Sequence, residues 1–480
     1  MVQRALVGTV GLEFRGADLG DRRRSARLTS IAETLEEQPA RGFPRLLGSD
    51  AALEAFYRFI NNPGFGAEDI VAPHIAATAE RAEEAGVVVA VHDTTLVEYS
   101  TKRRDLGVTT RKRRAHGFVA QVTLLVSKAD GLPLGVASLE TLRRSGQKWA
   151  KRKKEGQRGR VHRDDSNRES LRWIRSVEAV EAARRDRFGV IHVTDAEGDF
   201  FELFSRLNAL DTRFVIRAGQ LDRTVQTDQG ERKLREVLDE LSPQTWREIE
   251  VCERKYPARG VAKATRLRHP EREARVAHVA IASARVTLKG TKYSGVKTEP
   301  FQVNVIRVWE PRPPKNQPAV EWVLVTTEEV ASAGKLKHVV DLYRLRWIIE
   351  EYFKALKTGC SLEKRQVESY DALRKVLALF VPIAYRLLLL RGLERLDSNA
   401  PARRAFSETD LHIMANAPSN RSLKPPRTVT DALTHLARLG GHLKNNGPPG
   451  WQTLGWGYEK LLTLRLGWEM AMAAQKCDQS

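Results

Sequence analysis

Cysteine is scarce in this sequence, and long uninterrupted apolar runs are missing. The three cysteines, Cys252, Cys360 and Cys477, are far apart, so they offer neither a metal-ligand spacing nor an even disulfide set. The longest apolar stretch, near 376–390, is interrupted by a proline and an arginine, so we expect a buried helix there. The N-terminal segment lacks the pattern of a secretory signal. These absences predict a protein of the reducing cytoplasm with no membrane span.

Basic residues are what the sequence has in excess. Its 480 residues include 80 Lys and Arg against 60 Asp and Glu, which gives a net charge of +20. The hydrophobic share of 41% and the charged share of 29% indicate a folded chain, and the length predicts roughly two to four domains. A positive field attracts polyanions, and in the cytoplasm the usual polyanion is nucleic acid. Charge alone does not separate an enzyme from a packaging protein.

Short helices are predicted in the first 70 or so residues. Leu28 and Leu35 recur at helical spacing, and Ser49 can cap a second helix that ends before Pro63. The same region carries a cluster of arginines: Arg23, Arg24, Arg27 and Arg58. A solvated helix face would explain any one of them, but the cluster favours phosphate contact. We therefore predict a helical DNA-binding domain at residues 1–70.

Buried strands are predicted from residue 87 onward. Val87–Val91 is a continuous apolar run rich in β-branched residues, typical of a strand covered on both faces. The elements predicted next are strands Phe118–Val126 and Leu134–Leu139, helix Ser170–Ala183, strand Val190–Thr194, helix Phe201–Leu210 and strand Phe214–Ile216. This order matches a ribonuclease-H-like core. The predicted class is therefore α/β, with residues 71–367 as the catalytic domain.

Residues from about 221 to 320 interrupt this order. They alternate β-branched and charged residues, which predicts an inserted, mostly antiparallel β subdomain. A strand at Trp322–Thr326 and a long helix at about 335–357 follow, and residues 368–480 are predicted to be a helical domain. Two basic stretches stand out, Lys102–Arg114 and Arg143–Arg172. The second is too polar to pack a core and is predicted to be a mobile loop that nucleic acid orders, the alternative being a loop that only aids solubility.

Two aspartates follow predicted buried strands. Asp93 comes after Val87–Val91, and Asp195 comes after Val190–Thr194. A carboxylate at the end of an apolar strand needs a cation or a hydrogen-bond donor. Either aspartate alone could cap a turn, but two of them on strands expected to be neighbours favour a metal site. His92 is a weaker candidate, because an imidazole ligand suits softer metals.

A third carboxylate, Glu350, lies on the predicted long helix. Tyr343, Arg346 and Lys357 fall on the same stripe, within roughly 60° of one another at ~100° per residue. Three phosphate-binding groups around one metal ligand favour nucleic-acid chemistry, the alternative being a solvated face with an incidental Arg–Glu pair. We predict that the three carboxylates converge and hold two Mg²⁺ ions, with Mn²⁺ able to substitute, because hard cations prefer carboxylate oxygens.

The spacing Tyr-x2-Arg-x3-Glu-x6-Lys at 343–357 resembles the signature of a group of bacterial cut-and-paste transposases, the insertion-sequence-four family. Further matches are Leu19-Gly20-Asp21, Tyr57–Ile60, Asp93-Thr94-Thr95, Asp195 with Glu197 and Asp199, Ala437–Gly441 and Trp451–Tyr458. There are three departures. Ala196 stands where the family has a basic residue, and the stretch 143–172 is basic where the family's is acidic. The N-terminal segment also differs in detail, so we expect a different end sequence to be recognised.

This resemblance implies a DDE transposase, with Asp93, Asp195 and Glu350 as the catalytic residues and metal ligands. The DNA-binding residues that it implies are Tyr343, Arg346, Lys357 and Arg217, with Trp322 as a wall for a flipped base. Trp347, beside Arg346, is a candidate for a second wall, and the alternative for each tryptophan is packing in the core. It also implies a nucleoid-associated homodimer on double-stranded transposon ends and target DNA, with hairpin intermediates and a C-terminal dimerisation domain. The alternatives are a non-catalytic or inhibitory DNA-binding relative and a nuclease that cuts without joining.

Overall fold

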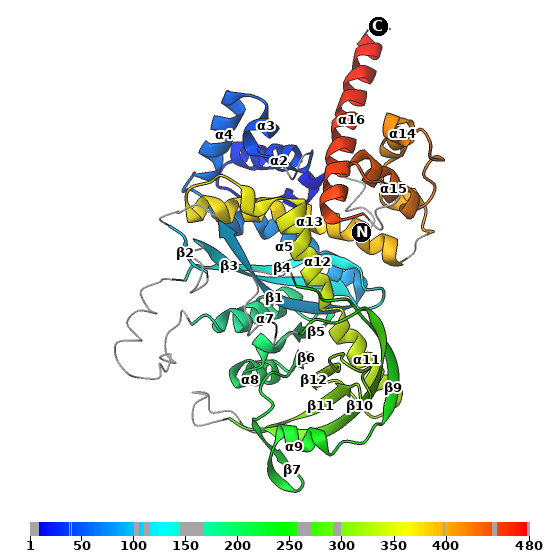
Figure 1. The fold of residues 1–480 in the computed structure, drawn as a ribbon. Helices are drawn as coiled ribbons and strands as arrows, with labels where there is room; N and C mark the ends of the chain where they lie inside the picture. Colours follow the sequence, from blue (N-terminus) through cyan, green and yellow to red (C-terminus); the bar gives the residue numbers. More distant parts are fainter. Residues whose placement is uncertain are drawn as a thin grey trace. The chain divides into compact units, whose positions relative to one another are not determined.

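The computed structural model describes residues 9–37, 39, 41–99, 105–109, 116–144, 168–256, 266, 270–290, 299–396, 399–443 and 449–477. The chain forms two compact units, one of Met1–Gly189 with Trp347–Ser480 and the other of Val190–Arg346. It is a mixed α/β protein whose strands are mostly antiparallel (Figure 1). Most of the two basic stretches lies outside the described residues, so their predicted role stays a prediction.

The sheet of the first unit is built around β3 (His116–Ser127), which is almost entirely buried. It pairs antiparallel with β1 (Val87–Tyr99) and with β4 (Pro133–Leu142), and the short β2 (Gly107–Val108) also lies against it. Helices α7 (Leu171–Arg184), α5 (Ala67–Ala85) and α13 (Tyr370–Leu396) contact β4. Cover on both faces explains why these strands are continuous apolar runs.

The two faces of this sheet can be told apart by the strand register. Side chains directly opposite each other on antiparallel strands share a face, and successive residues alternate between faces. Thr94, Gln121 and Glu140 lie opposite one another, and α7 binds this row. The next row contains Thr141, which accepts hydrogen bonds from α13. Asp93 precedes Thr94 by one residue, so its side chain lies on the α13 face.

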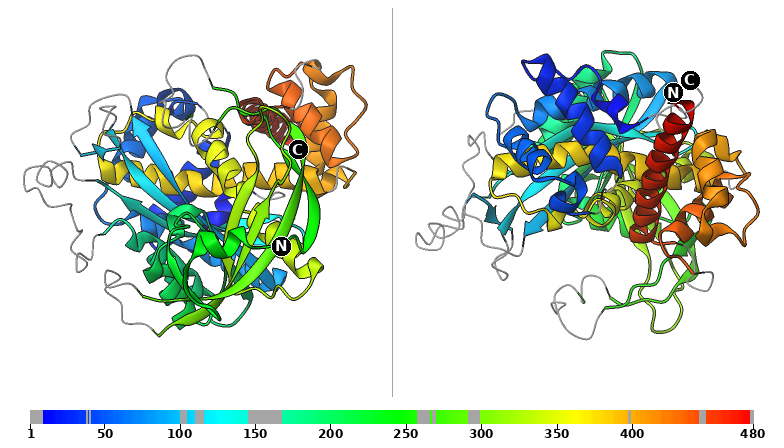
Figure 2. Two further views of the ribbon diagram at one scale, coloured as in Figure 1. Left: turned by 60° about the horizontal axis from the view of Figure 1, so that its bottom comes forward. Right: turned by 90° about the horizontal axis from the view of Figure 1, so that it is seen from above.

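Helices make up the rest of the first unit. Before the sheet these are η1 (Val10–Phe14), α2 (Arg22–Glu37), α3 (Phe43–Leu47) and α4 (Asp50–Ile60). After the second unit come α12 (Trp347–Lys354), η3 (Ala355–Gly359), η4 (Leu362–Lys364), α13, η5 (Ala402–Arg404), α14 (Glu408–Asn416), η6 (Pro418–Asn420), α15 (Val429–Leu439) and α16 (Trp451–Cys477). Figure 2 shows α16, in red, lying against α14 and α15, in orange. Ser49 caps α4 as predicted, accepting from the backbone N–H of Ala52 at 3.2 Å.

The apolar stretch near 376–390 lies in α13. Tyr370–Arg395 is long and apolar enough for a membrane span by length and composition, with a mean hydropathy of 1.9 in its most apolar window. However, 89% of that window is buried inside the protein. The helix is therefore a core helix of the first unit, as the sequence predicts.

The second unit is a sheet with the strand order β5 (Gly189–Thr194), β6 (Arg213–Arg217), β12 (Glu321–Thr326), β11 (Phe301–Trp309), β10 (Arg275–Leu288), β7 (Thr224–Thr227) and β8 (Gly230–Lys233). β9 (Thr245–Val251) also pairs with β10. The helices are η2 (Ala196–Gly198), α8 (Phe201–Ala209), α9 (Leu234–Asp239) and α11 (Ala333–Arg344). Among the described strands of this unit, β5 and β6 are the one parallel pair, and the inserted strands are antiparallel as predicted.

The inserted strands are not a separate sheet. β11 pairs with β12, and β12 pairs with β6, so the insertion extends the sheet that begins with β5. Within each unit the strands and helices follow the predicted order. Their assembly into a single ribonuclease-H-like core, and the domain boundaries at 70 and 367, stay predictions.

The predicted continuous helix over 335–357 is wrong. α11 ends at Arg344, α12 begins at Trp347, and Ala355–Gly359 is a π-helix. The break follows from a tightened last turn, in which the backbone N–H of Arg346 donates to the carbonyl of Tyr343 at 3.0 Å. Because three helical segments replace one, the angular stripe calculated for a straight helix does not apply.

Candidate active site

Asp93 lies inside a strand rather than after one, which corrects the sequence prediction. β1 continues to Tyr99, and Asp93 stands directly opposite Val122 of β3. The strand continues because residues 95, 97 and 99 are buried on the same face as Asp93. Asp93 is half-buried, and its Oδ1 accepts from the backbone N–H of Thr94 at 2.7 Å.

Asp195 directly follows the buried strand β5, as predicted. Its Oδ1 accepts from the backbone N–H of Glu197 at 2.8 Å and caps the short helix η2. Among the described residues, Oδ2 of Asp195 accepts no hydrogen bond. Capping therefore occupies one oxygen, and the other is available as a ligand.

Asp199 has a different role from Asp195, although both belong to the motif that the resemblance covers. Its side chain is fully buried and accepts from the backbone N–H groups of Gly219 and Gln220, both at 2.7 Å. The guanidinium of Arg223 also binds it. Asp199 therefore fixes the loop after β6. Its role is structural, and we do not count it among the metal ligands.

Glu350 is half-buried on α12, which contacts β1 of the same unit. Asp93 and Glu350 thus lie on two contacting elements of the first unit, whereas Asp195 belongs to the second. Among the described residues, no group of three or more His, Cys, Asp or Glu side chains is placed to hold a metal ion. The convergence of the three carboxylates stays a prediction.

The donor set nevertheless suits a hard divalent cation. Carboxylate oxygens are the ligands that Mg²⁺ prefers, and Oδ2 of Asp195 has no hydrogen bond in the described part of the chain. His92 does not belong to this set, because it is fully buried one residue before Asp93 and on the opposite face. Its Nδ1 lies 2.8 Å from Oγ1 of Thr123.

Trp322, Tyr343 and Arg346 form a cluster in the second unit. The rings of Trp322 and Tyr343 are 6.2 Å apart, and the guanidinium carbon of Arg346 lies 6.0 Å from the centre of the Tyr343 ring. Tyr343 is only 6% exposed, so its ring mainly packs against Trp322 and Arg346. Arg217, on β6, lies opposite Leu324 of β12, the strand that carries Trp322.

Lys357 and Trp347 lie in the first unit. The ammonium of Lys357 donates to the carbonyl of Leu96 on β1 and lies 3.2 Å from the carboxylate of Glu363. Trp347 is 51% exposed, and the ammonium of Lys354 lies 5.3 Å from its ring centre. The four signature residues are therefore divided, with Tyr343 and Arg346 in one unit and Glu350 and Lys357 in the other.

The arginines of the N-terminal helices are mostly exposed. Arg23 and Arg27 extend from α2 into solvent, and Arg58 on α4 forms an exposed pair with Glu54 at 3.7 Å. Arg24 is half-buried and donates to the carbonyl of Leu19 at 3.1 Å. Arg23 and Arg27 can therefore reach a phosphate directly, Arg58 would exchange Glu54 for one, and Arg24 has a structural contact.

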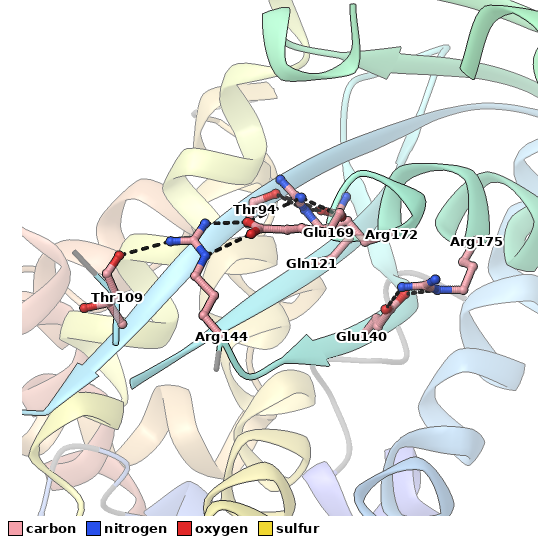
Figure 3. A network of polar contacts seen from close by, with 8 residues as sticks. All are labelled: Thr94, Thr109, Gln121, Glu140, Arg144, Glu169, Arg172 and Arg175. Atoms are coloured by element: carbon pink, nitrogen blue, oxygen red, sulfur yellow. Dashed lines mark hydrogen bonds and ion pairs between the residues drawn. The ribbon is translucent and has the colours of Figure 1, made fainter. Parts of the chain in front are cut away.

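Sequence reasoning missed a polar network behind Asp93. Arg172 of α7 contacts Thr94 on β1 and Gln121 on β3, and Arg144 pairs with Glu169 beside it (Figure 3). The available signal was Gln121 itself, a polar residue in the otherwise apolar run around 118–126. A buried amide in such a strand needs a partner.

Two family profiles match this chain. One, described as transposase DNA-binding, matches residues 10–64 and covers α2 to α4. The other, described as the transposase DDE domain, matches residues 135–381, just over half of the chain, and includes Asp195 and Glu350 but not Asp93.

Among solved structures, the chain is similar to the piggyBac transposase synaptic complex with hairpin DNA, determined by cryo-electron microscopy. The TM-score is 0.34 at 10% identity, and the match covers 74% of this chain and 57% of that one. The chain thus spans little more than half the length of this relative. On the extent of the profile match, the chain belongs to the DDE transposase family.

Proposed function

We propose that this protein is a Mg²⁺-dependent cut-and-paste transposase of the insertion-sequence-four group. In this proposal a homodimer binds paired transposon ends in the bacterial cytoplasm, cuts them through hairpin intermediates and joins their 3′ ends to target DNA. The observation that carries the proposal is the combination, in one chain of this family, of a DNA-binding segment and a DDE domain. The contact between β1 and α12, which carry Asp93 and Glu350, supports it.

The proposed chemistry needs negative charge to be neutralised at a phosphorus centre. Two divalent ions would activate the attacking water or 3′-hydroxyl and stabilise the leaving oxygen. Asp93, Glu350 and Asp195 would hold these ions through hard oxygen atoms. Asp93 and Glu350 belong to the first unit and Asp195 to the second.

Cationic and aromatic side chains would hold the DNA. Arg346, supported by the Tyr343 ring, can bind a phosphate through two N–H groups. Trp322, packed against Tyr343, and the exposed Trp347 offer flat surfaces for a base flipped out at a hairpin. Lys357 already pairs with Glu363, so its binding to DNA would exchange that carboxylate for a phosphate.

The decisive experiment changes each carboxylate in turn. Asp93→Ala, Asp195→Ala and Glu350→Ala should each abolish cutting of the element's own ends in Mg²⁺, because a lost ligand removes the metal site. End binding should stay near the wild-type level, because the arginines of α2 and α4 are untouched. Glu368→Ala, at an exposed carboxylate of the first unit, is the matched control and should cut normally.

The alternatives give different results in the same assays. Ends that are bound but never cut by the wild-type protein in Mg²⁺ or Mn²⁺ would indicate a non-catalytic relative. Cutting without joining of precut ends to target DNA would indicate a nuclease. Loss of end binding together with cutting in the three variants would assign the carboxylates a structural role.

A further inference from the structure

Arg172 is a buried charge on the far side of the strand that carries Asp93. The residue is 6% exposed and lies at the start of α7. Its Nε donates to Oγ1 of Thr94 at 3.3 Å and to Oε1 of Gln121 at 3.1 Å (Figure 3). Its Nη1 donates to the backbone carbonyl of Glu169 at 2.7 Å. Burial of a guanidinium costs stability unless hydrogen bonds offset it. These contacts therefore hold the Arg172 side chain in one position.

Arg172 is connected to Asp93 through Thr94. Thr94 and Gln121 are directly opposite each other on β1 and β3, and Oγ1 of Thr94 donates to Oε1 of Gln121 at 2.7 Å. The backbone N–H of the same Thr94 donates to Oδ1 of Asp93 at 2.7 Å. Arg172 therefore fixes the residue whose N–H orients the Asp93 carboxylate, although it lies on the opposite face of the sheet.

The orientation of Gln121 shows that the network is constrained. A guanidinium has only donors, so the oxygen of the amide must face Arg172. Within the described part of the chain this leaves Nε2 of Gln121, in a residue that is 1% exposed, without a hydrogen-bond partner. A buried unpaired donor is costly. The oxygen contacts of Gln121 therefore set its orientation at the expense of its nitrogen.

We propose that Arg172 is a positioning residue for the Asp93 metal ligand. It holds Thr94 and Gln121 together behind the strand, and the Thr94 N–H then holds Oδ1 of Asp93, which fixes the orientation of the carboxylate. Groups that orient a metal ligand from behind affect metal affinity although they do not touch the metal. The inference rests on the proposed function, because it assigns Asp93 to a metal site.

The same helix provides a matched control. Arg175 is on the same face of α7, one turn after Arg172, and its Nε donates to Glu140 on β4 at 3.0 Å (Figure 3). Its side chain is 40% exposed, and within the described part of the chain Glu140 forms no hydrogen bond or ion pair with Thr94 or Asp93. Arg175→Met thus removes an Arg–Glu contact between α7 and β4, at the other end of this row, and leaves the contacts of Arg172 with Thr94 and Gln121 in place.

The test measures Mn²⁺ binding to the DNA-free protein by electron paramagnetic resonance. The Mn²⁺ binding that is lost in Asp93→Ala defines the Asp93-dependent part. Arg172→Met keeps the apolar stem and removes the donors, so it should weaken that part by about 10–100-fold. The Mn²⁺ concentration needed for half-maximal cutting should rise in parallel, while end binding stays unchanged. Arg175→Met should match the wild-type protein in all three measurements.

A second pair of variants keeps the test informative if Arg172→Met does not fold. Thr94→Val removes the hydroxyl with little change in shape and should weaken Asp93-dependent Mn²⁺ binding, whereas Thr94→Ser, which keeps the hydroxyl, should not. Unchanged Mn²⁺ affinity in Arg172→Met, or in Thr94→Val if Arg172→Met is unfolded, would overturn the inference. The inference would also be overturned if Asp93→Ala bound Mn²⁺ as tightly as the wild-type protein. Wild-type protein that binds Mn²⁺ through Asp93 but cuts no DNA would refute the proposed function alone.

Discussion

At the scale of single residues, Glu13, His74 and Arg81 form a buried cluster of ionisable side chains. The backbone N–H of Val136 donates to Nε2 of His74 at 3.0 Å, so the proton of a neutral His74 is on Nδ1, 2.6 Å from Glu13. Burial lowers the pKa of His74 from 6.5, which agrees with this neutral form. Arg81 pairs with Glu13 at 2.9 Å. The cluster connects η1, α5 and β4.

This cluster predicts a loss of stability in acid. Burial raises the pKa of Glu13, but its contacts with His74 and Arg81 outweigh burial and lower it from 4.5 to about 2. The unfolded chain therefore takes up a proton on His74 below pH 6.5, and on Glu13 between pH 4.5 and 2, before the folded chain does. Both steps remove stability as the pH falls, with Glu13 contributing about 3 kcal/mol at ~1.4 kcal/mol per pKa unit.

Urea unfolding at a series of pH values checks this prediction. In Glu13→Gln the free energy of unfolding should be lower than in the wild type near neutral pH, because Arg81 loses its partner. The difference should shrink as the pH falls below 4.5, where the wild type loses the Glu13 contribution. A constant difference across this range would contradict the assignment.

At the scale of helices, one carboxylate joins segments from both ends of the chain. Glu36 on α2 is 2% exposed. It accepts from the backbone N–H of Val10 at 2.8 Å and from the hydroxyl of Tyr458 on α16 at 3.1 Å, and Arg386 on α13 lies 2.6 Å away. The DNA-binding segment is thereby attached to the C-terminal helices within one compact unit.

Removing this carboxylate should destabilise the first unit strongly. Glu36→Ala leaves Arg386 buried without its counter-charge, and the expected loss in the free energy of unfolding is about 3–5 kcal/mol. Glu33→Ala is the control, one turn earlier on the same helix, because Glu33 is half-buried and its carboxylate accepts from the hydroxyl of Thr9 at 2.7 Å. That variant should lose about 1 kcal/mol or less. Equal losses in the two variants would contradict a special role for Glu36.

At the scale of the whole molecule, the net charge of +20 is the property most directly related to DNA. Each phosphate that a cationic side chain neutralises releases counterions, so affinity falls as salt rises. The exposed arginines of α2 lie in the segment that matches the DNA-binding profile. Their contribution is therefore measurable as a change in the salt dependence of end binding.

Replacing Arg23 and Arg27 together by Gln should weaken end binding. It should also reduce the slope of log affinity against log salt by about 2, at roughly one unit for each lost phosphate contact. Fluorescence anisotropy of a labelled end over a salt series measures both quantities. Arg232→Gln is the control, because Glu240 already pairs with that side chain. A slope that does not change in the double variant would exclude these arginines from phosphate contact.

Element identity followed from the sequence because it depends on local patterns. The apolar runs around 87–91, 118–126 and 190–194 are long enough to be buried strands wherever they pack, and Ser49 caps α4 through a contact three residues away. The lengths of elements were less predictable. β1 continues past Asp93 because β3 pairs with it as far as Tyr99, and that pairing is not a local property.

Positions of side chains across the chain were decided by the tertiary structure. Sequence alone identified Asp93 and Asp195, because a carboxylate beside an apolar strand is costly without a partner. It identified Glu350 because Tyr343, Arg346 and Lys357 recur around it at helical spacing. It could not reveal that Arg172 supports Asp93 from the opposite face, or that Glu36 joins α2 to α13 and α16. Those contacts join residues far apart in the chain, and only packing brings them within hydrogen-bond distance.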